Sequence, residues 1–239
     1  MRQRASVAVM AAALIVLGAA ALAGEAEMPV VYQEDFEKGE PLKQWEPMDP
    51  KAWKIAEQDG NHVLSMFQKS KFKTKVRSPF NFGLLKDRVV GDFVLDLKMQ
   101  SKTKDYGHRD LCLFFGYQNP THYYYVHMAL RADAHAHSVF IVNGKPRTTL
   151  IKEIGKDIGG EVYRTKGLVW GDGWHHVRLV REVDTGLIEV YFDDMTQPIM
   201  RAKDKTFTWG RVGVGSFDDI GNYDDIVLRG VKVEPPAKK

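Results

Sequence analysis

The residues best suited to chemistry are concentrated in one stretch of the chain. Five of the eight histidines lie between His108 and His137, close to several carboxylates and to the single cysteine. Imidazole and carboxylate groups can exchange protons as a general acid and base, hydrogen-bond a polar ligand, or bind a transition metal ion. The chemistry therefore depends on which of these side chains the secondary structure places together.

Alternation of side-chain type predicts a β-hairpin in this stretch, with strands at Leu111–Tyr117 and His122–Leu130. A four-residue loop between the strands would place Cys112 opposite His127, with Asp110 one diagonal step away. One face of the hairpin is then apolar and belongs to the core. The other face carries a carboxylate, an imidazole and several aromatic rings.

This second face is the predicted ligand site. Asp110 and His127 are the candidate catalytic acid/base pair. Aromatic surfaces beside a few fixed polar groups are typical of a carbohydrate site. The predicted ligand-binding residues are the aromatic side chains of this face and the imidazole and guanidinium groups near it: Tyr123, Tyr125, Phe114, His108, His135, His137 and Arg109.

Three interpretations of the histidines remain open. They can be structural residues satisfied by their neighbours, they can hydrogen-bond a sugar, or they can bind Zn²⁺ or a similar ion. The pattern His135-x-His137 is too loose to select the metal, and no second firm ligand pair supports it. Cys112 is more typical of a small packed side chain than of a nucleophile.

Acidic residues at the two ends of the chain form a second candidate site. Asp35 and Glu37 lie in the first predicted strand, and Asp224 and Asp225 lie in the last one. If these strands are neighbours, their carboxylates provide the oxygen ligands that Ca²⁺ prefers. The alternative is that these residues only close turns and keep them soluble.

The first 23 residues resemble a signal peptide. Arg2 and Arg4 precede an apolar run, Ala5–Ala20, and Ala21–Ala23 forms a small-x-small cleavage site. The chain is therefore expected to be secreted or periplasmic, with one domain at 24–234, a frayed tail at 235–239 and no membrane span once the signal is removed. A lone cysteine forms no internal disulfide, so stability must come from a hydrophobic core.

The charge of the expected mature chain argues against nucleic-acid binding. Cleavage removes Arg2 and Arg4, so the 34 basic residues become 32 against 31 acidic ones, a balance of about +1. The chain also has no P-loop and no Gly-rich dinucleotide motif. The expected partner is therefore a carbohydrate or glycoside.

Period-two alternation continues along the chain and predicts an all-β fold, a two-sheet antiparallel jelly-roll β-sandwich. Turn signals such as Asp59-Gly60 and Asn143-Gly144 separate the strands. Besides the hairpin, the predicted strands are Val30–Glu37, Trp53–Ala56, His62–Phe67, Val89–Ser101, Ser138–Asn143, Trp174–Glu182, Leu187–Asp193, Arg211–Phe217 and Asp224–Val233.

Three segments carry a family resemblance: EDFEKGEPLKQW near the start, the strands at Trp53–Ile55 and Asn61–Leu64, and the closing GRVGVGSFDDIGNYDDIVL. They resemble the concanavalin A-like lectin/glucanase superfamily, and more narrowly its laminin-G-like and 3-keto-disaccharide hydrolase-type domains of secreted bacterial proteins. The resemblance implies two curved antiparallel sheets with a sugar-binding concave face. Fold does not fix function, because such sandwiches include enzymes, lectins and adhesion modules.

The expected function is recognition of glycans or glycosides through the concave sheet. Cleavage of 3-keto-glycosides by Asp110 and His127 is the enzymatic hypothesis, which the sequence leaves undecided. Laminarinase-type chemistry is disfavoured because the chain lacks the E-x-D-x-x-E motif. The alternative is a non-catalytic laminin-G-like adhesion or structural domain with protein partners.

The signal sequence makes a direct prediction. Protein recovered outside the cytoplasm should begin near Gly24, because cleavage follows the small-x-small site. Intact-mass analysis measures this, and full-length protein found only in the cytosol would contradict it.

Overall fold

The structure is a computed structural model that describes residues 28–235. The predicted signal peptide and residues 236–239 lie outside the described part. Almost all regular structure is extended, and the only helical turns in the described part are two short 3-10 segments, η1 (Pro41–Gln44) and η2 (Pro50–Ala52). The prediction of an all-β chain is therefore confirmed.

In chain order the strands are β1 (Val30–Glu34), β2 (Trp45–Pro47), β3 (Trp53–Gln58), β4 (Asn61–Met66), β5 (Asn81–Ser101), β6 (Asp110–Asn119), β7 (His122–Ala129), β8 (Ser138–Asn143), β9 (Thr148–Thr149), β10 (Tyr163–Arg164), β11 (His175–Arg181), β12 (Leu187–Phe192), β13 (Met200–Lys203), β14 (Gly210–Ser216) and β15 (Gly221–Lys232). Each predicted strand has a counterpart in the structure, but β5 begins at Asn81 instead of Val89 and β1 ends at Glu34 instead of Glu37. The strands β2, β9, β10 and β13 were not predicted.

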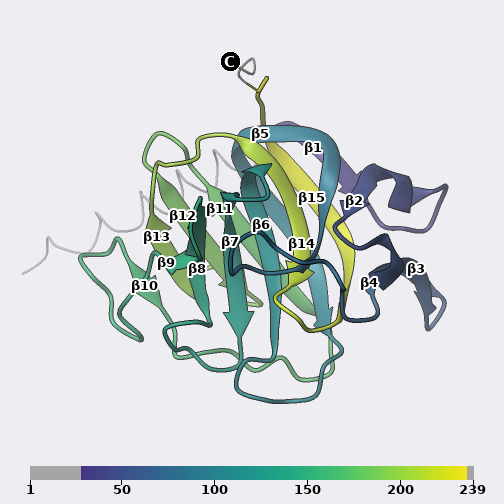
Figure 1. The fold of residues 1–239 in the computed structure, drawn as a ribbon, viewed down its shortest axis with the longest axis horizontal. Coiled ribbons are helices and arrows are strands. Elements are labelled where there is room, and N and C mark those ends of the chain that lie inside the picture. Colours follow the sequence, from purple (N-terminus) through teal and green to yellow (C-terminus); the bar gives the residue numbers. More distant parts are fainter. Residues whose placement is uncertain (1–27, 236–239) are drawn as a thin grey trace, which may run out of the picture.

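Strand β5 joins the two layers of the sandwich (Figure 1). Its first part pairs with β14 and β2, and through β14 it continues the layer β6, β7, β8 and β9. Its second part pairs with β11 and β15, which belong to the other layer, with β12, β13 and β10 beyond β11. Every strand pair described is antiparallel. One long bent strand therefore fixes how the two sheets face each other.

The main core fills the space between the layers. Leu111, Leu113 and Phe115 of β6 belong to the same buried cluster as Leu95 and Leu97 of β5. Each such side chain is at most 1% exposed, and full burial of a Leu or Phe side chain contributes about 1.5–3 kcal/mol. Because the single cysteine is free and buried, this core replaces disulfides as the source of stability.

The predicted register of the β6–β7 hairpin is confirmed. Cys112 pairs with His127, and Phe114 pairs with Tyr125. The turn is tighter than predicted, since β6 continues to Asn119. The register of the pair shifts beyond Phe115, where Gly116 has a φ of 56°. This bulge accommodates the additional residues of β6. The predicted four-residue loop is thus replaced by a bulge followed by a short turn.

The opposite face of this hairpin carries a second buried cluster. Phe114, Tyr123 and Tyr125 pack there with Phe82 and Phe140, and each ring is at most 2% exposed. The coil between β4 and β5 crosses this face, and its partly buried Val76 packs on the cluster (Figure 1). The face that the sequence predicts as an open ligand surface is therefore largely covered, and only its end remains accessible.

Candidate functional site

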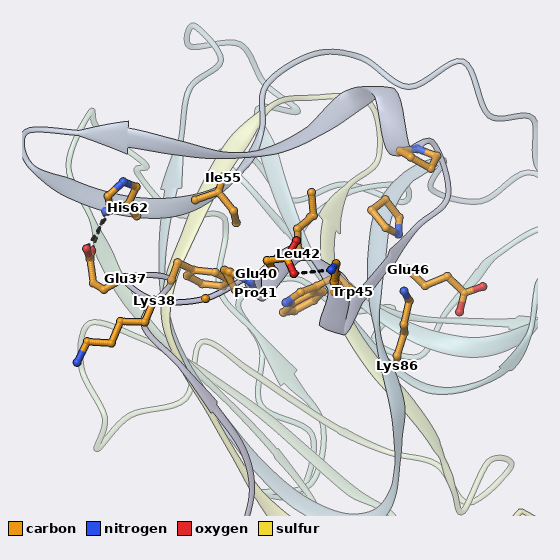
Figure 2. A pocket seen from close by; sticks show the side chains of 15 residues that line it. Glu37, Lys38, Glu40, Pro41, Leu42, Trp45, Glu46, Ile55, His62 and Lys86 are labelled. Carbon is orange, nitrogen blue, oxygen red and sulfur yellow. Dashed lines mark hydrogen bonds and ion pairs between the residues drawn. The ribbon is translucent and has the colours of Figure 1, made fainter.

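One pocket shares no lining residue with the histidine-rich hairpin, and Figure 2 shows it from close by. It has a volume of about 730 Å³ and lies between the segment after β1 and the β3–β4 hairpin, with Leu42, Trp45 and Ile55 in its apolar lining. Its ionisable Glu37 and His62 bind each other at 3.0 Å. Of the predicted site residues, it contains only Glu37.

A smaller pocket of about 230 Å³ lies where β6 begins and β7 ends, and we call it the end pocket. It brings together four of the residues that the sequence singled out, Asp110, His127, His108 and His135. Its full lining is Arg77, Tyr106, His108, Asp110, His127, His135, Arg147, Phe217 and Asp218.

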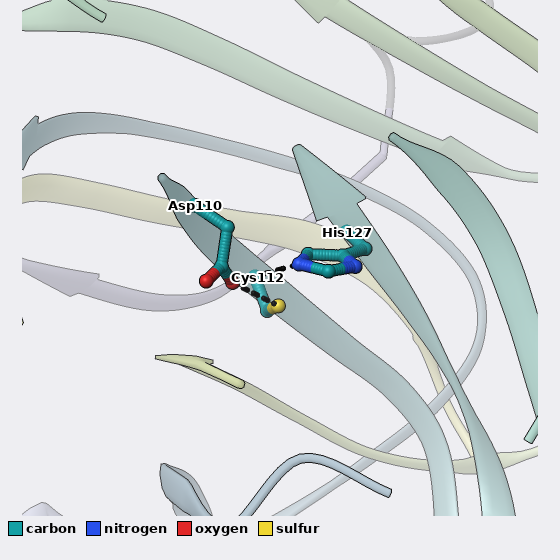
Figure 3. Close-up of side chains that lie close together, drawn as sticks. All are labelled: Asp110, Cys112 and His127. Carbon is teal, nitrogen blue, oxygen red and sulfur yellow. Dashed lines mark hydrogen bonds and ion pairs between the residues drawn. The ribbon is translucent and has the colours of Figure 1, made fainter. Parts of the chain in front are cut away.

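The floor of the end pocket is a buried trio, Asp110, Cys112 and His127 (Figure 3). Asp110 is 1% exposed, Cys112 0% and His127 3%. His127 Nε2 lies 3.2 Å from Asp110 Oδ2, and Cys112 Sγ donates to the same oxygen at 3.1 Å. The predicted proximity of the carboxylate, thiol and imidazole is therefore present.

The imidazole of His127 lies between two oxygen atoms. Its Nδ1 is 3.1 Å from the carbonyl oxygen of His135, to which only a protonated nitrogen can donate. Its Nε2 is near the Asp110 carboxylate, but the contact lacks the alignment of a hydrogen bond. A bare lone pair on Nε2 would repel that carboxylate, so this position favours a positive charge.

Asp110 is held as an anion. Burial by itself would raise the pKa of Asp110, but the charge and hydrogen bonding of His127 and the Phe217 N–H outweigh it, so the pKa lies below its usual value. Ser216 Oγ donates to Oδ1 and the Phe217 N–H donates to Oδ2, both at 3.0 Å. Burial, followed by the charge of Asp110, raises the pKa of the Cys112 thiol.

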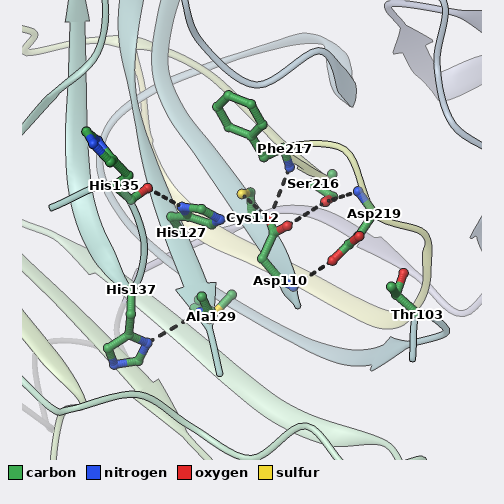
Figure 4. A network of polar contacts seen from close by, with 12 residues as sticks. Thr103, Asp110, Cys112, His127, Ala129, His135, His137, Ser216, Phe217 and Asp219 are labelled. Atoms are coloured by element: carbon green, nitrogen blue, oxygen red, sulfur yellow. Dashed lines mark hydrogen bonds and ion pairs between the residues drawn. The ribbon is translucent and has the colours of Figure 1, made fainter. Parts of the chain in front are cut away.

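A second carboxylate, Asp219, extends this network (Figure 4). Its Oδ2 accepts the Asp110 N–H at 2.9 Å, and its carboxylate accepts the Tyr106 hydroxyl at 3.0 Å. Burial, followed by the charge of Asp110, raises the pKa of Asp219 to about 6. The sequence carries no local signal that the turn with Asp219 meets the start of β6.

The rim of the end pocket is polar and partly exposed. His108 Nε2 binds Asp133 at 2.6 Å. The Arg147 guanidinium lies 4.4 Å above the Phe217 ring and donates to the His135 carbonyl at 3.3 Å. Sequence analysis missed Arg147, because it follows β8 and reaches the pocket only through tertiary packing.

Two sets of predicted ligand residues do not reach the end pocket. Tyr123, Tyr125 and Phe114 are buried in the second cluster, so their faces pack on protein and not on a ligand. Arg109 is also buried and donates to Ser101 Oγ and to backbone carbonyls. The structure departs from the prediction here because alternation identifies a shared face without showing what covers it.

His137 likewise does not face the pocket. It is fully buried, with a φ of 52°, and its Nδ1 accepts the Ala129 N–H while its Nε2 contacts Thr165 Oγ1 at 2.7 Å. Burial, followed by the charges of His127 and Arg164, lowers the pKa of His137 to about 3. His137 is therefore a neutral structural residue.

The four predicted calcium ligands are distributed over different contacts. Glu37 binds His62, Asp224 accepts from Asn61 at 2.8 Å, and Asp225 pairs with Lys98 at 2.7 Å. Asp35 and Asp225 share a small pocket beside β1.

None of the four belongs to a group of three or more potential metal ligands within residues 28–235. Strands β1 and β15 are neighbours as expected, but the ligand atoms do not converge. Calcium binding stays a prediction.

The geometry limits the chemistry that the floor can perform. Asp110 already accepts from three donors besides His127, and both residues are almost fully buried. A general base needs access to the proton that it removes. The trio therefore fixes the shape and charge of the pocket floor, whereas contact with a ligand falls to the rim.

Comparison with known proteins supports the fold. No family model and no curated protein matches the chain. Among solved structures, the chain is similar to a protein of unknown function with a galectin-like fold from Bacillus subtilis, with a TM-score of 0.55, 12% identity and coverage of 87% of this chain and 99% of that one.

Two further similarities are to proteins whose names refer to sugar binding. The carbohydrate-binding module CBM66 from Bacillus subtilis has a TM-score of 0.51 and 14% identity, covering 78% of this chain and 96% of that one. The winged bean acidic lectin in complex with methyl-α-D-galactose has a TM-score of 0.50 and 12% identity, and the match covers 85% of this chain and 99% of the lectin chain. At these identities the comparisons establish a lectin-like β-sandwich fold. In residues 28–235 no helix is long and apolar enough to cross a membrane.

The buried ion pair generates a stability prediction. Asp110→Asn should lower the free energy of unfolding by about 3–5 kcal/mol, because it removes the buried anion that faces His127 and accepts hydrogen bonds from Ser216 and Phe217. Chemical denaturation at neutral pH measures this. The matched control is Asp218→Asn on the pocket rim, which should change stability by no more than about 0.5 kcal/mol. Equal effects of the two substitutions would contradict a buried pair.

The burial of His137 predicts acid sensitivity. Its folded pKa, about 3, lies below the ordinary 6.5, so its contribution to stability is complete above pH 6.5 and is lost as the pH falls. The slope from this group is at most about 1.4 kcal/mol per pH unit.

His137→Asn should make the decline in unfolding free energy between pH 7 and pH 4.5 shallower, since Asn does not titrate and tolerates a positive φ. His135→Asn, two residues away and exposed, should leave the slope unchanged. An unchanged slope in His137→Asn would contradict the assignment.

Proposed function

We propose that this protein binds a carbohydrate carrying an acidic group, and that the ligand occupies the end pocket. The lectin-like fold supports sugar binding in general, and the pocket composition supports the location. A polar rim above a rigid, charged floor provides the directional hydrogen bonds that sugar hydroxyl groups need. The volume of about 230 Å³ suits one sugar unit of a longer glycan, with the remainder outside.

One observation carries the proposal. Arg147 lines the end pocket, and its Nε atom is buried without a hydrogen-bond partner in the described part of the chain. A buried donor that is left unsatisfied costs about 1–3 kcal/mol. A ligand oxygen that draws the Arg147 guanidinium toward the pocket and accepts from it would recover that energy on binding.

The charge of the rim points to an acidic ligand. Within residues 28–235 neither Arg77 nor Arg147 forms an ion pair with a carboxylate. The acidic residues of the lining already have partners, His127 for Asp110 and, at 3.9 Å, Lys69 for Asp218. The two guanidinium groups are thus free to bind a uronate carboxylate or a sulfate, which suit the planar arginine fork.

Two other hypotheses make different claims about the same protein. Cleavage of a 3-keto-glycoside by Asp110 and His127 would require the ligand to reach a pair that is at most 3% exposed. A laminin-G-like adhesion role would instead require a protein partner. Export, which the N-terminal sequence predicts, would place any of these activities outside the cytoplasm.

The test is binding to a glycan array followed by calorimetry on the hits. Uronic or sulfated glycans should bind, and binding should weaken as salt rises because exposed charges are screened. Arg147→Gln should weaken binding by about 10- to 100-fold, the loss expected for a hydrogen bond to a charged group. Lys86→Ala in the larger pocket is the matched control and should bind normally.

Several outcomes would overturn this proposal. Neutral and acidic glycans could bind equally, or Lys86→Ala could lose affinity while Arg147→Gln keeps it. Product analysis of each bound glycan separates binding from catalysis, because a binding protein returns its ligand unchanged. The absence of any glycan hit would favour the adhesion hypothesis.

A further inference from the structure

The floor of the end pocket contains three different metal-ligand types within reach of one another. Asp110 Oδ2, Cys112 Sγ and His127 Nε2 all lie within 4.8 Å of one another (Figure 3). Oxygen, sulfur and nitrogen donors together suit a borderline transition metal such as Zn²⁺ better than Ca²⁺ or Mg²⁺, which prefer oxygen alone.

An independent observation points to a cation at this position. His127 is 3% exposed, and its Nε2 atom has no aligned hydrogen bond although it faces the Asp110 carboxylate. Its Nδ1 is engaged by the His135 carbonyl. This arrangement leaves Nε2 to carry either a proton or a metal ion, because a bare lone pair would face a negative charge.

We propose that Asp110, Cys112 and His127 form a binding site for Zn²⁺ or a similar divalent transition metal. The metal site does not depend on which ligand fills the end pocket, so the metal proposal is tested independently of carbohydrate binding.

The separations are close to those of a zinc tetrahedron. Bonds of about 2.0 Å to oxygen and nitrogen and about 2.3 Å to sulfur imply O···N and O···S edges of roughly 3.3 and 3.5 Å. The observed distances are 3.2 Å between Asp110 Oδ2 and His127 Nε2, and 3.1 Å between Oδ2 and Cys112 Sγ. The third edge, between Cys112 Sγ and the His127 nitrogen, is within 4.8 Å.

The buried charge also balances. With Zn²⁺ bound to a neutral imidazole, the Cys112 thiol gives up its proton to solvent, and the carboxylate and the thiolate cancel the two charges of the ion. The occupied site is therefore neutral, so binding leaves no uncompensated charge in the interior.

The surrounding residues hold the ligands as metal sites require. A metal-binding histidine usually donates its other N–H to a carbonyl or carboxylate, and His127 does so to His135. Ser216 Oγ and the Phe217 N–H hold the Asp110 carboxylate. Asp110 and His127 line the end pocket but are almost fully buried, so a water molecule, and not the carbohydrate, would take the fourth position.

Cobalt provides the test, because its absorption reports both geometry and sulfur ligation. One equivalent of Co²⁺ is added to the reduced mature protein, which begins near Gly24. It should produce a thiolate-to-cobalt charge-transfer band and the intense visible bands of tetrahedral cobalt. Zn²⁺ should bleach both. Zn²⁺ should also raise the melting temperature, because it binds the folded state.

Substitutions identify the ligands. Cys112→Ser keeps the size of the side chain and should lose the charge-transfer band and the response of the melting temperature to Zn²⁺. His108→Ala and His135→Ala are matched controls that remove rim imidazoles but keep the His135 carbonyl, and both should bind Co²⁺ as the wild type does. Near-ultraviolet circular dichroism verifies folding, and Cys112→Ala replaces Cys112→Ser if the latter does not fold.

Two results would overturn the proposal. Folded wild-type protein could show no thiolate band with Co²⁺. Alternatively, the band and the stabilisation by Zn²⁺ could persist in Cys112→Ser, or disappear in His108→Ala and His135→Ala, which would place the ion on surface histidines.

Discussion

The arrangement of the end pocket depends on one buried carboxylate. Asp110 begins β6, contacts His127 on β7, and accepts hydrogen bonds from Ser216 and Phe217 at the end of β14. A carboxylate removed from water is tolerated only when opposite charge and hydrogen-bond donors surround it. Satisfying Asp110 therefore fixes three segments relative to one another, and with them the shape of the pocket that they line.

The aromatic face beside this carboxylate has a different role from the one its composition suggests. The rings of Phe82, Phe114 and Tyr125 stack on one another beneath the coil between β4 and β5. Burying them stabilises the sheet from its second side, as the main core does from the first. Covering the aromatic face also confines access to the end of the sheet, where polar groups and not rings are presented.

The aromatic face is covered and the polar end of the sheet is accessible. This contrast explains how a lectin-like fold can carry different chemistry at its site. The sandwich supplies rigid strands, and function depends on the residues at its accessible end. Within residues 28–235 they include arginines without ion-pair partners, exposed histidines and a floor of mixed donor atoms. The larger pocket beside β2 instead combines the apolar Leu42, Trp45 and Ile55 with a carboxylate–histidine pair that is already formed.

The sequence by itself determined the local geometry. Period-two alternation identified the strands, and the hairpin register placed Cys112 opposite His127 with Asp110 nearby, because pairing in a hairpin depends on a short loop and on side-chain alternation. Alternation shows which residues share a face, but it carries no information about segments far away in the chain.

Only the tertiary structure decided that Val76 and its coil cover the aromatic rings, that Asp219 and Arg147 join the site, and that the acidic ends do not converge. Each of these outcomes depends on contacts between residues that are distant in sequence. They follow from how the two sheets and their connecting segments pack, which no local pattern encodes.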